Sequence, residues 1–364
     1  MTICKISLAE ESDEELLRNC LRSNEMPGTI SVAFESEPNF FDAINIQGTK
    51  TQVVVGKTEN NKVIGFGTRA IRPVYVNGEV IDVGYLSGLR VNPEFRNNSF
   101  LARGYKFFRE LDSDGKVPFY LTTIIEDNVV ARRILESGRA SLPNYIPIDR
   151  LSTFIIKTGK RESRKVHEVV KGNEVRLEEI VGFMNEHGRD KQFFPYYDES
   201  DFGTGRLRGL NQCDFYVAIE GDEILGVVAK WDQESFKQTR VTGYDWRMQV
   251  ARPLINLSSR FSNIPKLPKE GELLHYFYAS FPVIRENDPT ILSSLLNEVA
   301  SDPQNRGYDY FTLGLTENDN LREAIKPFHP RVYPSRVYLV SFDKSKEDLK
   351  YLNGRTPYLE VGTL

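Results

Sequence analysis

The sequence predicts an α/β protein, in the sense of an α+β arrangement around a mixed sheet, made of two domains that follow one another along the chain. Three observations support this. The chain of 364 residues is long for one domain and sufficient for two. Segments with strand and helix patterns alternate through the first half, and a similar order returns in the second half. A charged stretch short of apolar residues, 159–165, lies between them, so we expect domains over residues 1–160 and 161–364.

A hairpin is the clearest local signal in the first half. The pair Asn77-Gly78 joins two runs rich in β-branched residues, and both residues accept the positive φ angles of a two-residue turn. Pro73 places the first arm at a sheet edge or in a bulge, because proline donates no ladder hydrogen bond. Gly84 and Gly88 in the second arm allow a bulge or the close approach of a ligand. The elements expected in this half are a helix over 13–22, strands over 51–56, 62–76 and 79–91, a helix over 100–111, a strand over 119–125, a helix over 129–137 and a strand over 151–157.

The second half repeats the beginning of this pattern. The strand-like run at 53–57 has a counterpart at 216–220, and each is followed by a polar turn and a second run that ends in glycine, at Gly65 or Gly226. We interpret the second half as a duplicated copy of the first. Its expected elements are a helix over 173–187, a hairpin of 214–220 and 223–230, a mostly helical stretch over 245–261, a strand over 274–280, a helix over 290–300, a strand over 308–315 and a short helix after 320.

The composition is that of an ordinary globular protein and argues against several classes of function. A net charge of −4 and a pI near 5.8 argue against a nucleic-acid partner, which requires a basic surface. No apolar run is long enough for a membrane helix and the first residues lack a signal-peptide pattern, so we expect a cytoplasmic protein with no membrane partner. Three scattered cysteines predict a reducing compartment. The four histidines lie far apart without neighbours at ligand spacing, so we expect no metal.

Residues 86–138 form the segment most informative about function. Two strands each run into the beginning of a helix here, and small polar residues, Asn97, Asn98 and Ser99, occupy the first junction. Helix N-termini present unpaired backbone N–H groups and the positive end of a dipole, and together these bind anions such as phosphate. The segment therefore predicts an anion site at the ends of the two strands.

This segment resembles the cofactor-binding part of the GCN5-related N-acetyltransferases (GNAT), and the resemblance extends over about residues 1–158. After its fourth strand the family has Leu-x-Val-x-Pro, and then a basic residue or Gln opens a glycine-rich loop; the matching residues here are Leu89, Val91, Pro93 and Arg96. The resemblance implies that this strand end, the loop and the following helix hold acetyl-CoA, at Leu89, Val91, Arg96, Asn97, Asn98, Ser99, Phe100 and Leu101. The loop departs from the family pattern, because Asn97, Ser99 and Leu101 stand where glycine or alanine is usual.

A second part of the resemblance follows the next strand. The family commonly shows Asn-x-x-Ala-x-x-x-Tyr and then glycine, and this spacing is kept approximately by Asn128, Ala131, Leu135 and Gly138. The resemblance implies that Asn128 binds the pantetheine amides and that the small Ala131 admits the thioester arm. Arg132 is a candidate partner for cofactor phosphates. Leu135 replaces the tyrosine usually proposed to protonate the leaving thiolate.

Three residues are candidates for the catalytic steps. The acceptor amine must lose a proton before it attacks the thioester, and the nearest carboxylates are Asp82, on the strand before the loop, and Glu126, at the end of the next strand. Tyr85 is the candidate that replaces the missing phenol as an acid. The resemblance implies that the backbone N–H of Val91 donates to the thioester carbonyl, where negative charge develops.

The sequence thus predicts two GNAT-like domains in tandem, of which the second is a degenerate copy without the loop. The expected function is an N-acetyltransferase that moves an acetyl group from acetyl-CoA to an amine of a small molecule, an amino acid or a peptide by direct attack. The second domain would help to shape the acceptor pocket or have a structural role. Two alternatives stay open. One is a non-catalytic binding or scaffolding protein with the paired folds, which Leu101 and Leu135 favour; the other is a transferase of aminoacyl or longer acyl groups.

Overall fold

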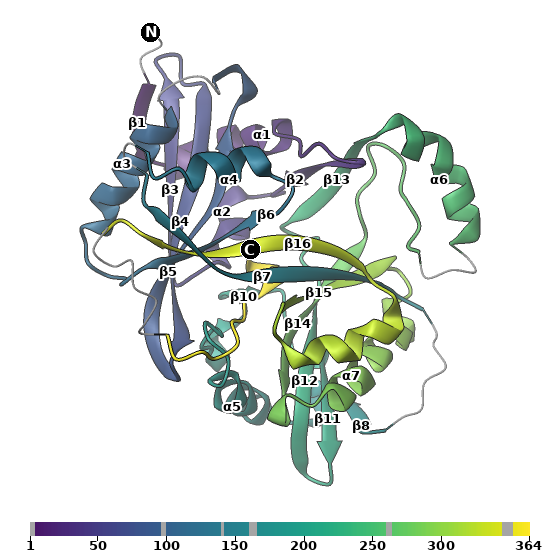
Figure 1. Cartoon of the computed structure of the whole chain (residues 1–364). Coiled ribbons are helices and arrows are strands. Elements are labelled where there is room, and N and C mark those ends of the chain that lie inside the picture. The colour runs from purple at the N-terminus through teal and green to yellow at the C-terminus, as the bar shows by residue number, and fades with distance from the viewer. Residues whose placement is uncertain (1–3, 96–99, 140–141, 160–165, 260–263, 344–351) are drawn as a thin grey trace.

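The structure is a computed structural model that describes residues 4–95, 100–139, 142–159, 166–259, 264–343 and 352–364. One sheet of twelve strands runs through the molecule, in the order β1-β3-β4-β5-β6-β16-β7-β15-β14-β12-β11-β8. The first half of the chain forms the lobe at the upper left of Figure 1 and the second half most of the lobe below, with β7 and β16 crossing between them. The predicted combination of helices with a mixed sheet is confirmed.

The elements predicted for the first half are all present. The structure adds β1, β2 and α2, which are short and carry weaker patterns. The elements are β1 (Cys4–Leu8), α1 (Glu14–Ser23), β2 (Ile30–Glu35), α2 (Phe40–Asn45), β3 (Lys50–Thr58), β4 (Val63–Val76), β5 (Glu79–Val91), α3 (Phe100–Asp112), β6 (Tyr120–Ile125), α4 (Val129–Leu135) and β7 (Asn144–Lys157).

The hairpin at Asn77-Gly78 is confirmed. Both residues have positive φ, 57° and 90°, and the register of β4 with β5 closes at Val76–Glu79. Strand β4 pairs with β3 only as far as Ile71, so Pro73 lies beyond β3, where its missing N–H costs no ladder bond.

The second half also contains the predicted elements, and the structure adds β8, β13 and β16. The main elements are β8 (Glu168–Lys171), α5 (Leu177–Gly188), β11 (Phe215–Glu220), β12 (Glu223–Trp231), β13 (Gln238–Tyr244), α6 (Trp246–Ser258), β14 (Tyr276–Ile284), α7 (Pro289–Ser301), β15 (Tyr310–Thr316), a 3-10 helix over Asn320–Phe328 and β16 (Arg331–Ser341).

Strands β7 and β16 exchange places between the two halves. Strand β16, late in the chain, pairs with β6 of the first half, whereas β7 pairs with β15 of the second half. The two strands also pair with each other along most of their length, which joins the halves into one sheet (Figure 1). An alternating pattern specifies a strand and its buried face but leaves its neighbours open, so the sequence did not indicate this exchange.

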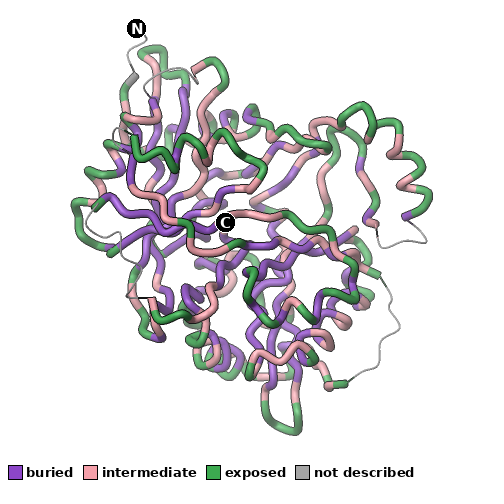
Figure 2. Tube along the Cα trace, viewed as in Figure 1, coloured by how far each residue is buried: buried purple, intermediate pink, exposed green. Residues whose placement is uncertain are grey.

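Helices pack on both faces of the sheet and bury its core. In the first half α3 covers one face, and α1 with α2 covers the other. In the second half α7 and the 3-10 helix Asn320–Phe328 cover one face, and α5 covers the other. Figure 2 shows the buried strands at the centre, while α6 lies apart from the sheet and buries none of its residues.

None of the helices in the part of the chain that the structure describes is long and apolar enough to cross a membrane. Within the same residues, no group of three or more His, Cys, Asp or Glu side chains is placed to hold a metal ion.

Candidate functional site between strands β5 and β6

The parallel strands β5 and β6 separate from one another within the sheet. They pair in register only at Gly84–Tyr120 and Tyr85–Leu121, although both strands are described along their whole length. Beyond these positions β5 keeps β4 as its neighbour and β6 keeps β16. We call the resulting gap, between residues 86–91 and 122–125, the β5–β6 wedge.

Side-chain hydrogen bonds hold the narrow end of the wedge. Thr122 Oγ1 donates to the backbone oxygen of Leu86 over 2.7 Å. On the other face of the sheet, the hydroxyl of Tyr85 lies 3.3 Å from Thr123 Oγ1. These contacts fix the point from which the two strands diverge.

Two glycines shape β5 at this point. A Cβ atom on Gly84 would lie 2.1 Å from the ring of Tyr120, so glycine is required where the strands are closest. Gly88 has a φ of +64°, and the register shifts there so that Gly88 and Leu89 together oppose Gly67 of β4. The bulge that the sequence allowed in this arm is confirmed at Gly88, and the group close to Gly84 is the ring of Tyr120.

Helix α3 begins at Phe100, at the wide end of the wedge. Phe100 is buried beside Ile64, and Val91 at the end of β5 packs against the same two residues. Leu101 is half-buried in the core between α3 and the sheet. The predicted loop residues before this helix lie outside the described residues; they are Arg96, Asn97, Asn98 and Ser99.

Helix α4 begins at the opposite side of the wide end. Asn128 caps it, because its Oδ1 accepts a hydrogen bond from the backbone N–H of Ala131 over 3.1 Å. Leu135 is buried in the core beneath α3, and Ala131 packs against that core together with Leu89 of β5. The structure thus brings Leu89, Leu101, Ala131 and Leu135 into one apolar cluster beside the wedge.

Arg132 on α4 has an incompletely bonded guanidinium. Its Nε is buried and has no hydrogen-bond partner among the described residues. Buried donors are almost always paired, so an unpaired one indicates a group that a ligand or solvent can satisfy. Its neighbour Arg133 is exposed and makes a natural comparison.

Tyr85 is buried at the narrow end, on the face away from α3 and α4. The guanidinium carbon of Arg72 lies 4.5 Å from the centre of its ring. Burial raises the pKa of Tyr85, and the bond to Thr123 and the charge of Arg72 oppose this only in part. The phenol is therefore protonated at neutral pH. Arg72 in turn donates from Nη1 to Thr363 Oγ1 over 3.0 Å, although its Nε has no partner among the described residues.

The two candidate carboxylates lie at opposite ends of the site. Asp82 is exposed on β5, before the paired positions and therefore on the far side from the wedge. Glu126 follows β6 at the wide end, where it accepts a hydrogen bond from Arg150 over 2.5 Å and lies 3.7 Å from Arg336. The hydrogen bond from Arg150, together with the charges of Arg150 and Arg336, lowers the pKa of Glu126. Glu126 is thus held ionised between two arginines.

A second pair of parallel strands separates in the same manner in the other half. Strands β14 and β15 pair only from Tyr276–Tyr310 to Tyr278–Thr312 and then diverge. The segment 356–364 enters this second gap. Thr316 Oγ1 donates to the backbone oxygen of Pro357 over 2.7 Å.

Glu360 anchors this segment inside the second gap. Its carboxylate is 1% exposed and accepts a hydrogen bond from the backbone N–H of Phe281 over 3.0 Å, at a bulge of β14 where Phe281 has a φ of +56°. A Cβ atom on Gly314 would lie 2.3 Å from Val361, so the packing here is tight. The protein itself therefore fills the second gap, and the β5–β6 wedge is the better candidate for a ligand.

Lys237 lies against the same segment and offers a test of this packing by pH. Its ammonium donates to the backbone oxygens of Leu364 and Gly362 over 3.0 and 3.4 Å. Burial lowers its pKa from 10.5 to about 8, and the charge of Glu360 opposes the shift. Between these two values the unfolded chain binds more protons than the folded one, so the free energy of unfolding contributed by Lys237 rises with pH.

We expect the unfolding free energy of the protein, relative to that of Lys237→Met, to increase by about 2–3 kcal/mol from pH 8 to pH 10.5. Urea unfolding of both proteins across this range measures it. Tyrosines that titrate in the same range affect both proteins equally and cancel in the difference. If the unfolding free energies of the two proteins changed equally with pH, the ammonium of Lys237 would be solvated in the folded protein.

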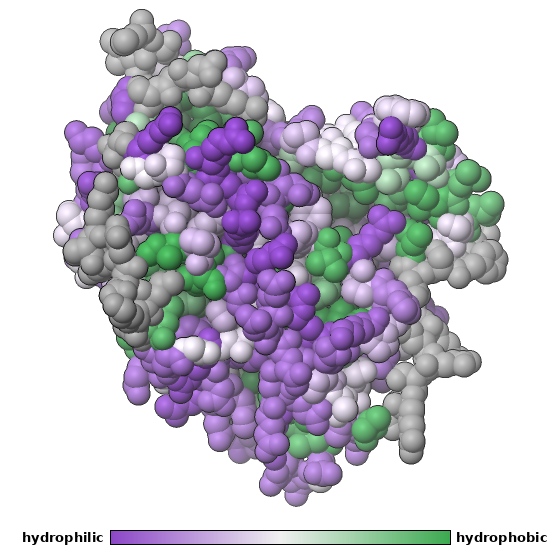
Figure 3. All heavy atoms as spheres, in the orientation of Figure 1, coloured by the Kyte–Doolittle hydropathy of each residue, from purple (hydrophilic) through white to green (hydrophobic). Residues whose placement is uncertain are grey.

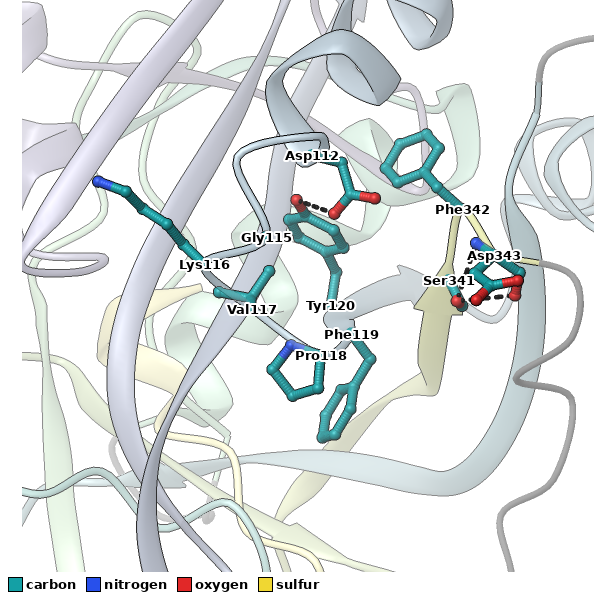
Figure 4. Close-up of a pocket in the computed structure, with 10 residues that line it drawn as sticks. All are labelled: Asp112, Gly115, Lys116, Val117, Pro118, Phe119, Tyr120, Ser341, Phe342 and Asp343. Carbon is teal, nitrogen blue, oxygen red and sulfur yellow. Dashed lines mark hydrogen bonds between the residues drawn. The ribbon is translucent and has the colours of Figure 1, made fainter.

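A surface hollow of about 440 Å³ lies at the other end of β6 (Figure 4). Its wall includes Tyr120, whose hydroxyl donates to Asp112 over 2.8 Å and accepts from Arg69 Nε over 2.9 Å. Arg69 is also paired with Asp114. These polar groups satisfy one another, and the hollow lies at the start of β6 rather than at the wedge, so we do not assign the functional site to it.

Several residues around the wedge were not indicated by the sequence analysis. They are Arg72, Thr122, Thr123, Arg150 and Arg336. Three of them had a signal in the sequence. Arg72 is a charged residue inside the long apolar run of β4, and Thr122 and Thr123 are polar residues in the apolar run of β6. The two arginines carried no signal, because they come from β7 and β16, whose exchange between the halves brings them to Glu126.

No protein-family model matches the sequence, and no curated protein matches it. Solved structures do match its fold. Saccharomyces cerevisiae N-myristoyltransferase with bound myristoyl-CoA aligns with 93% of this chain and 79% of its own, with a TM-score of 0.62 and 10% identity. A GCN5-related N-acetyltransferase from Sphaerobacter thermophilus aligns with 86% of this chain and 83% of its own, with a TM-score of 0.52 and 12% identity.

A third structure is that of a conserved protein from Enterococcus faecalis V583, a probable N-acyltransferase. It aligns with 93% of this chain and 72% of its own, with a TM-score of 0.52 and 10% identity. At these identities the likeness is one of fold. This chain therefore has the fold shared by the GCN5-related N-acetyltransferases and N-myristoyltransferase, as the resemblance of its sequence implied.

Proposed function

We propose that this protein is an acyltransferase that moves an acyl group from coenzyme A to an amine, with acetyl as the expected group. The β5–β6 wedge is the observation that carries the proposal. It places the beginnings of two helices at its wide end and an apolar cluster along its side. Helix N-termini suit the phosphates of the cofactor, and an apolar wall suits its pantetheine arm.

The residues present fit this cofactor. Leu89, Val91, Phe100 and Leu101 form part of the wall, Asn128 and Ala131 begin the second helix, and the loop 96–99 precedes the first. Arg132 supports the assignment most directly, since its unpaired buried Nε is suited to a phosphate oxygen or a carbonyl of the ligand. In this proposal Arg132 and the start of α3 hold the charged end of coenzyme A.

Coenzyme A supplies an acyl thioester, whose carbonyl carbon an amine can attack. In the proposed reaction the amine gives its proton to solvent water, while a C–N bond forms and the C–S bond breaks. Asp82 lies before the paired positions, on the far side from the wedge, so we do not assign it as the base. Val91 lies six residues beyond Tyr85 on β5, roughly 20 Å away at about 3.3 Å per residue, so we assign its N–H to the cofactor at the wide end and not to the carbonyl beside Tyr85. Tyr85 gives its proton to the departing sulfur and regains one from solvent. Its raised pKa supports this role, because the phenol is protonated at neutral pH.

Glu126 is also poorly suited to act as the base. Its lowered pKa and its two arginine partners make it a weak proton acceptor. We therefore propose that Glu126 positions Arg150 and Arg336 at the wide end of the wedge.

The competing function is the binding of acyl-CoA without transfer. Leu135 is buried in the apolar core and supplies no phenol, so turnover depends on Tyr85 in our proposal. The length of the acyl group is a separate question, because one of the structures of similar fold binds myristoyl-CoA.

Calorimetry with acetyl-CoA, myristoyl-CoA and free coenzyme A tests the proposal. We expect binding, and we expect Arg132→Gln to weaken it about 10-fold, since a hydrogen bond to a charged group contributes about 1.5–3 kcal/mol. Arg133→Gln is the matched control, one position away on the exposed side of the same helix, and should change the Kd less than about 3-fold.

The absence of binding to all three compounds, with the circular dichroism of the folded protein unchanged, would contradict the proposal. If binding occurs, release of free thiol in the presence of a panel of small amines, amino acids and peptides separates transfer from binding alone. Binding without thiol release from any of these acceptors would favour the competing function.

A further inference from the structure

Helix α6 turns its apolar residues away from the protein. Four large apolar side chains, Trp246, Val250, Leu254 and Leu257, are each between 63% and 74% exposed. Their spacing of four, four and three residues places them in one stripe along the helix. We call this set the α6 stripe. Figure 3 shows hydrophobic residues gathered over α6, at the right of the molecule.

The inner side of α6 is held by polar contacts. Arg252 Nη1 donates to the backbone oxygen of Pro268 over 2.8 Å. The side chain of Asn256 exchanges two hydrogen bonds with the backbone of Leu267, of 2.9 and 2.8 Å. Asp245 caps the helix by accepting from the N–H of Met248 over 2.7 Å. The polar side of the helix is thus used for attachment, so the outward position of the stripe is fixed by the fold.

This orientation is opposite to that of the other long helices. In α1, α3, α5 and α7 the buried residues are mostly apolar and face the sheet, whereas α6 buries none of its residues. Large apolar residues exposed together on one face usually mark a surface that contacts another molecule or a membrane. The α6 stripe is therefore a candidate contact surface.

The charge of α6 indicates what covers it. The helix contains Arg247 and Arg252 and no acidic residue, although the whole chain has a net charge of −4. The guanidinium of Arg247 lies 5.3 Å from the ring centre of Trp246, so the positive charge accompanies the stripe. A tryptophan beside arginine, followed by aliphatic residues, suits the boundary between lipid headgroups and acyl chains.

A second copy of the chain is a poorer partner for this surface. A two-fold dimer would place the stripe against itself, and with it Arg247 of both copies, so that like charges would meet. The helix is also only about 20 Å long, which is short for a stable interface on its own. An anionic lipid surface is complementary to the positive charge of the helix. The four apolar side chains can enter such a surface by their own length, without a partner interface.

We propose that α6 docks this protein on an anionic lipid surface by inserting the α6 stripe at the level of the headgroups. The inference is independent of the proposed acyl transfer, because it uses none of the residues of the wedge. It departs from the sequence-based expectation of no membrane partner. That expectation rested on the absence of a long apolar run, and residues spaced along one helix face do not form a run.

Co-sedimentation of the full chain with vesicles tests the proposal. The vesicles are phosphatidylcholine alone, or phosphatidylcholine with about 30 mol% phosphatidylserine. We expect binding to the anionic vesicles, weaker binding at high salt, and a decrease of about 10-fold or more in the partition coefficient of the double variant Val250→Gln/Leu254→Gln. Val80→Gln is the matched control, since Val80 is an exposed valine on the β4–β5 hairpin, and it should bind like the unaltered protein.

Tryptophan fluorescence gives a second readout on the same samples. The chain has two tryptophans, of which Trp231 is fully buried and Trp246 is 71% exposed. Insertion should shift the emission of Trp246 to shorter wavelength when anionic vesicles are added, and Trp246→Phe should abolish this change. Trp231 reports in all cases on the intact fold.

Three results would overturn the proposal. The first is no sedimentation with anionic vesicles and no spectral shift from the folded protein. The second is equal sedimentation of the double variant and the unaltered protein. The third is a concentration-dependent dimer that the double variant abolishes, with no vesicle binding, which would assign the stripe to a second copy.

Discussion

Replacing Glu360 with alanine is expected to lower the free energy of unfolding by about 3–5 kcal/mol, because each buried donor left without an acceptor costs about 1–3 kcal/mol. The carboxylate is 1% exposed and accepts four hydrogen bonds inside the second gap. The donors are Ser280 Oγ at 2.9 Å, the Phe281 N–H at 3.0 Å, the Tyr358 hydroxyl at 2.5 Å and the Gly362 N–H at 2.9 Å. Urea unfolding followed by circular dichroism measures the change.

Two further variants separate this effect from the loss of volume. Glu360→Gln keeps the shape but turns an NH₂ group towards donors, so we expect a smaller loss of about 1–3 kcal/mol. Glu223→Ala is the surface control; Glu223 is exposed and paired with Arg285, and its loss should change the stability by less than about 0.5 kcal/mol. A loss below about 1 kcal/mol for Glu360→Ala would show that the segment 356–364 does not hold the two strands together as we infer.

Replacing Tyr85 with phenylalanine is expected to lower kcat about 100-fold, with the Kd of the acyl-CoA nearly unchanged, because general acid catalysis contributes at least this much. Thiol release at saturating substrate measures kcat, and calorimetry measures the Kd. Since burial raises the pKa of Tyr85, the phenol should not limit the rate until the pH exceeds its ordinary value of about 10.

The control for this variant is a tyrosine that loses a similar bond elsewhere. The hydroxyl of Tyr216 donates to Asp302 over 2.6 Å in the second half, so Tyr216→Phe removes a buried hydrogen bond without touching the wedge. It should leave kcat unchanged. Full activity of Tyr85→Phe would exclude Tyr85 as the acid. Asp82→Asn is expected to keep full activity in the same assay, because Asp82 lies on the far side of the paired positions from the wedge.

Part of the candidate site could be predicted from the sequence because its signals are local. Asn128 lies three residues before Ala131, and its cap uses a backbone N–H within the same turn. Gly88 lies in a strand pattern where glycine indicates a bulge, and the bulge is present. The resemblance to the GNAT pattern then placed Leu89, Ala131 and Leu135 on neighbouring elements, and they share one apolar cluster.

The remainder of the site depends on residues far apart along the chain. Glu126 meets Arg336, 210 positions later, only because β16 lies beside β6. Arg72 meets Thr363 through the segment 356–364. No periodicity within either segment specifies these pairs, because the energy of each depends on partners that the whole fold brings together.

The sequence by itself determined the kinds of elements, the hairpin at Asn77-Gly78 and the strand-to-helix order around the wedge. Each of these follows from backbone preferences and side-chain periodicity over a few residues. Only the tertiary structure decided the exchange of β7 with β16, the filling of the second gap by Glu360 and the outward face of α6. These three features depend on which buried hydrogen-bond donors are paired with acceptors and on which apolar surfaces are buried. Contacts between residues far apart in the sequence determine both the pairing and the burial.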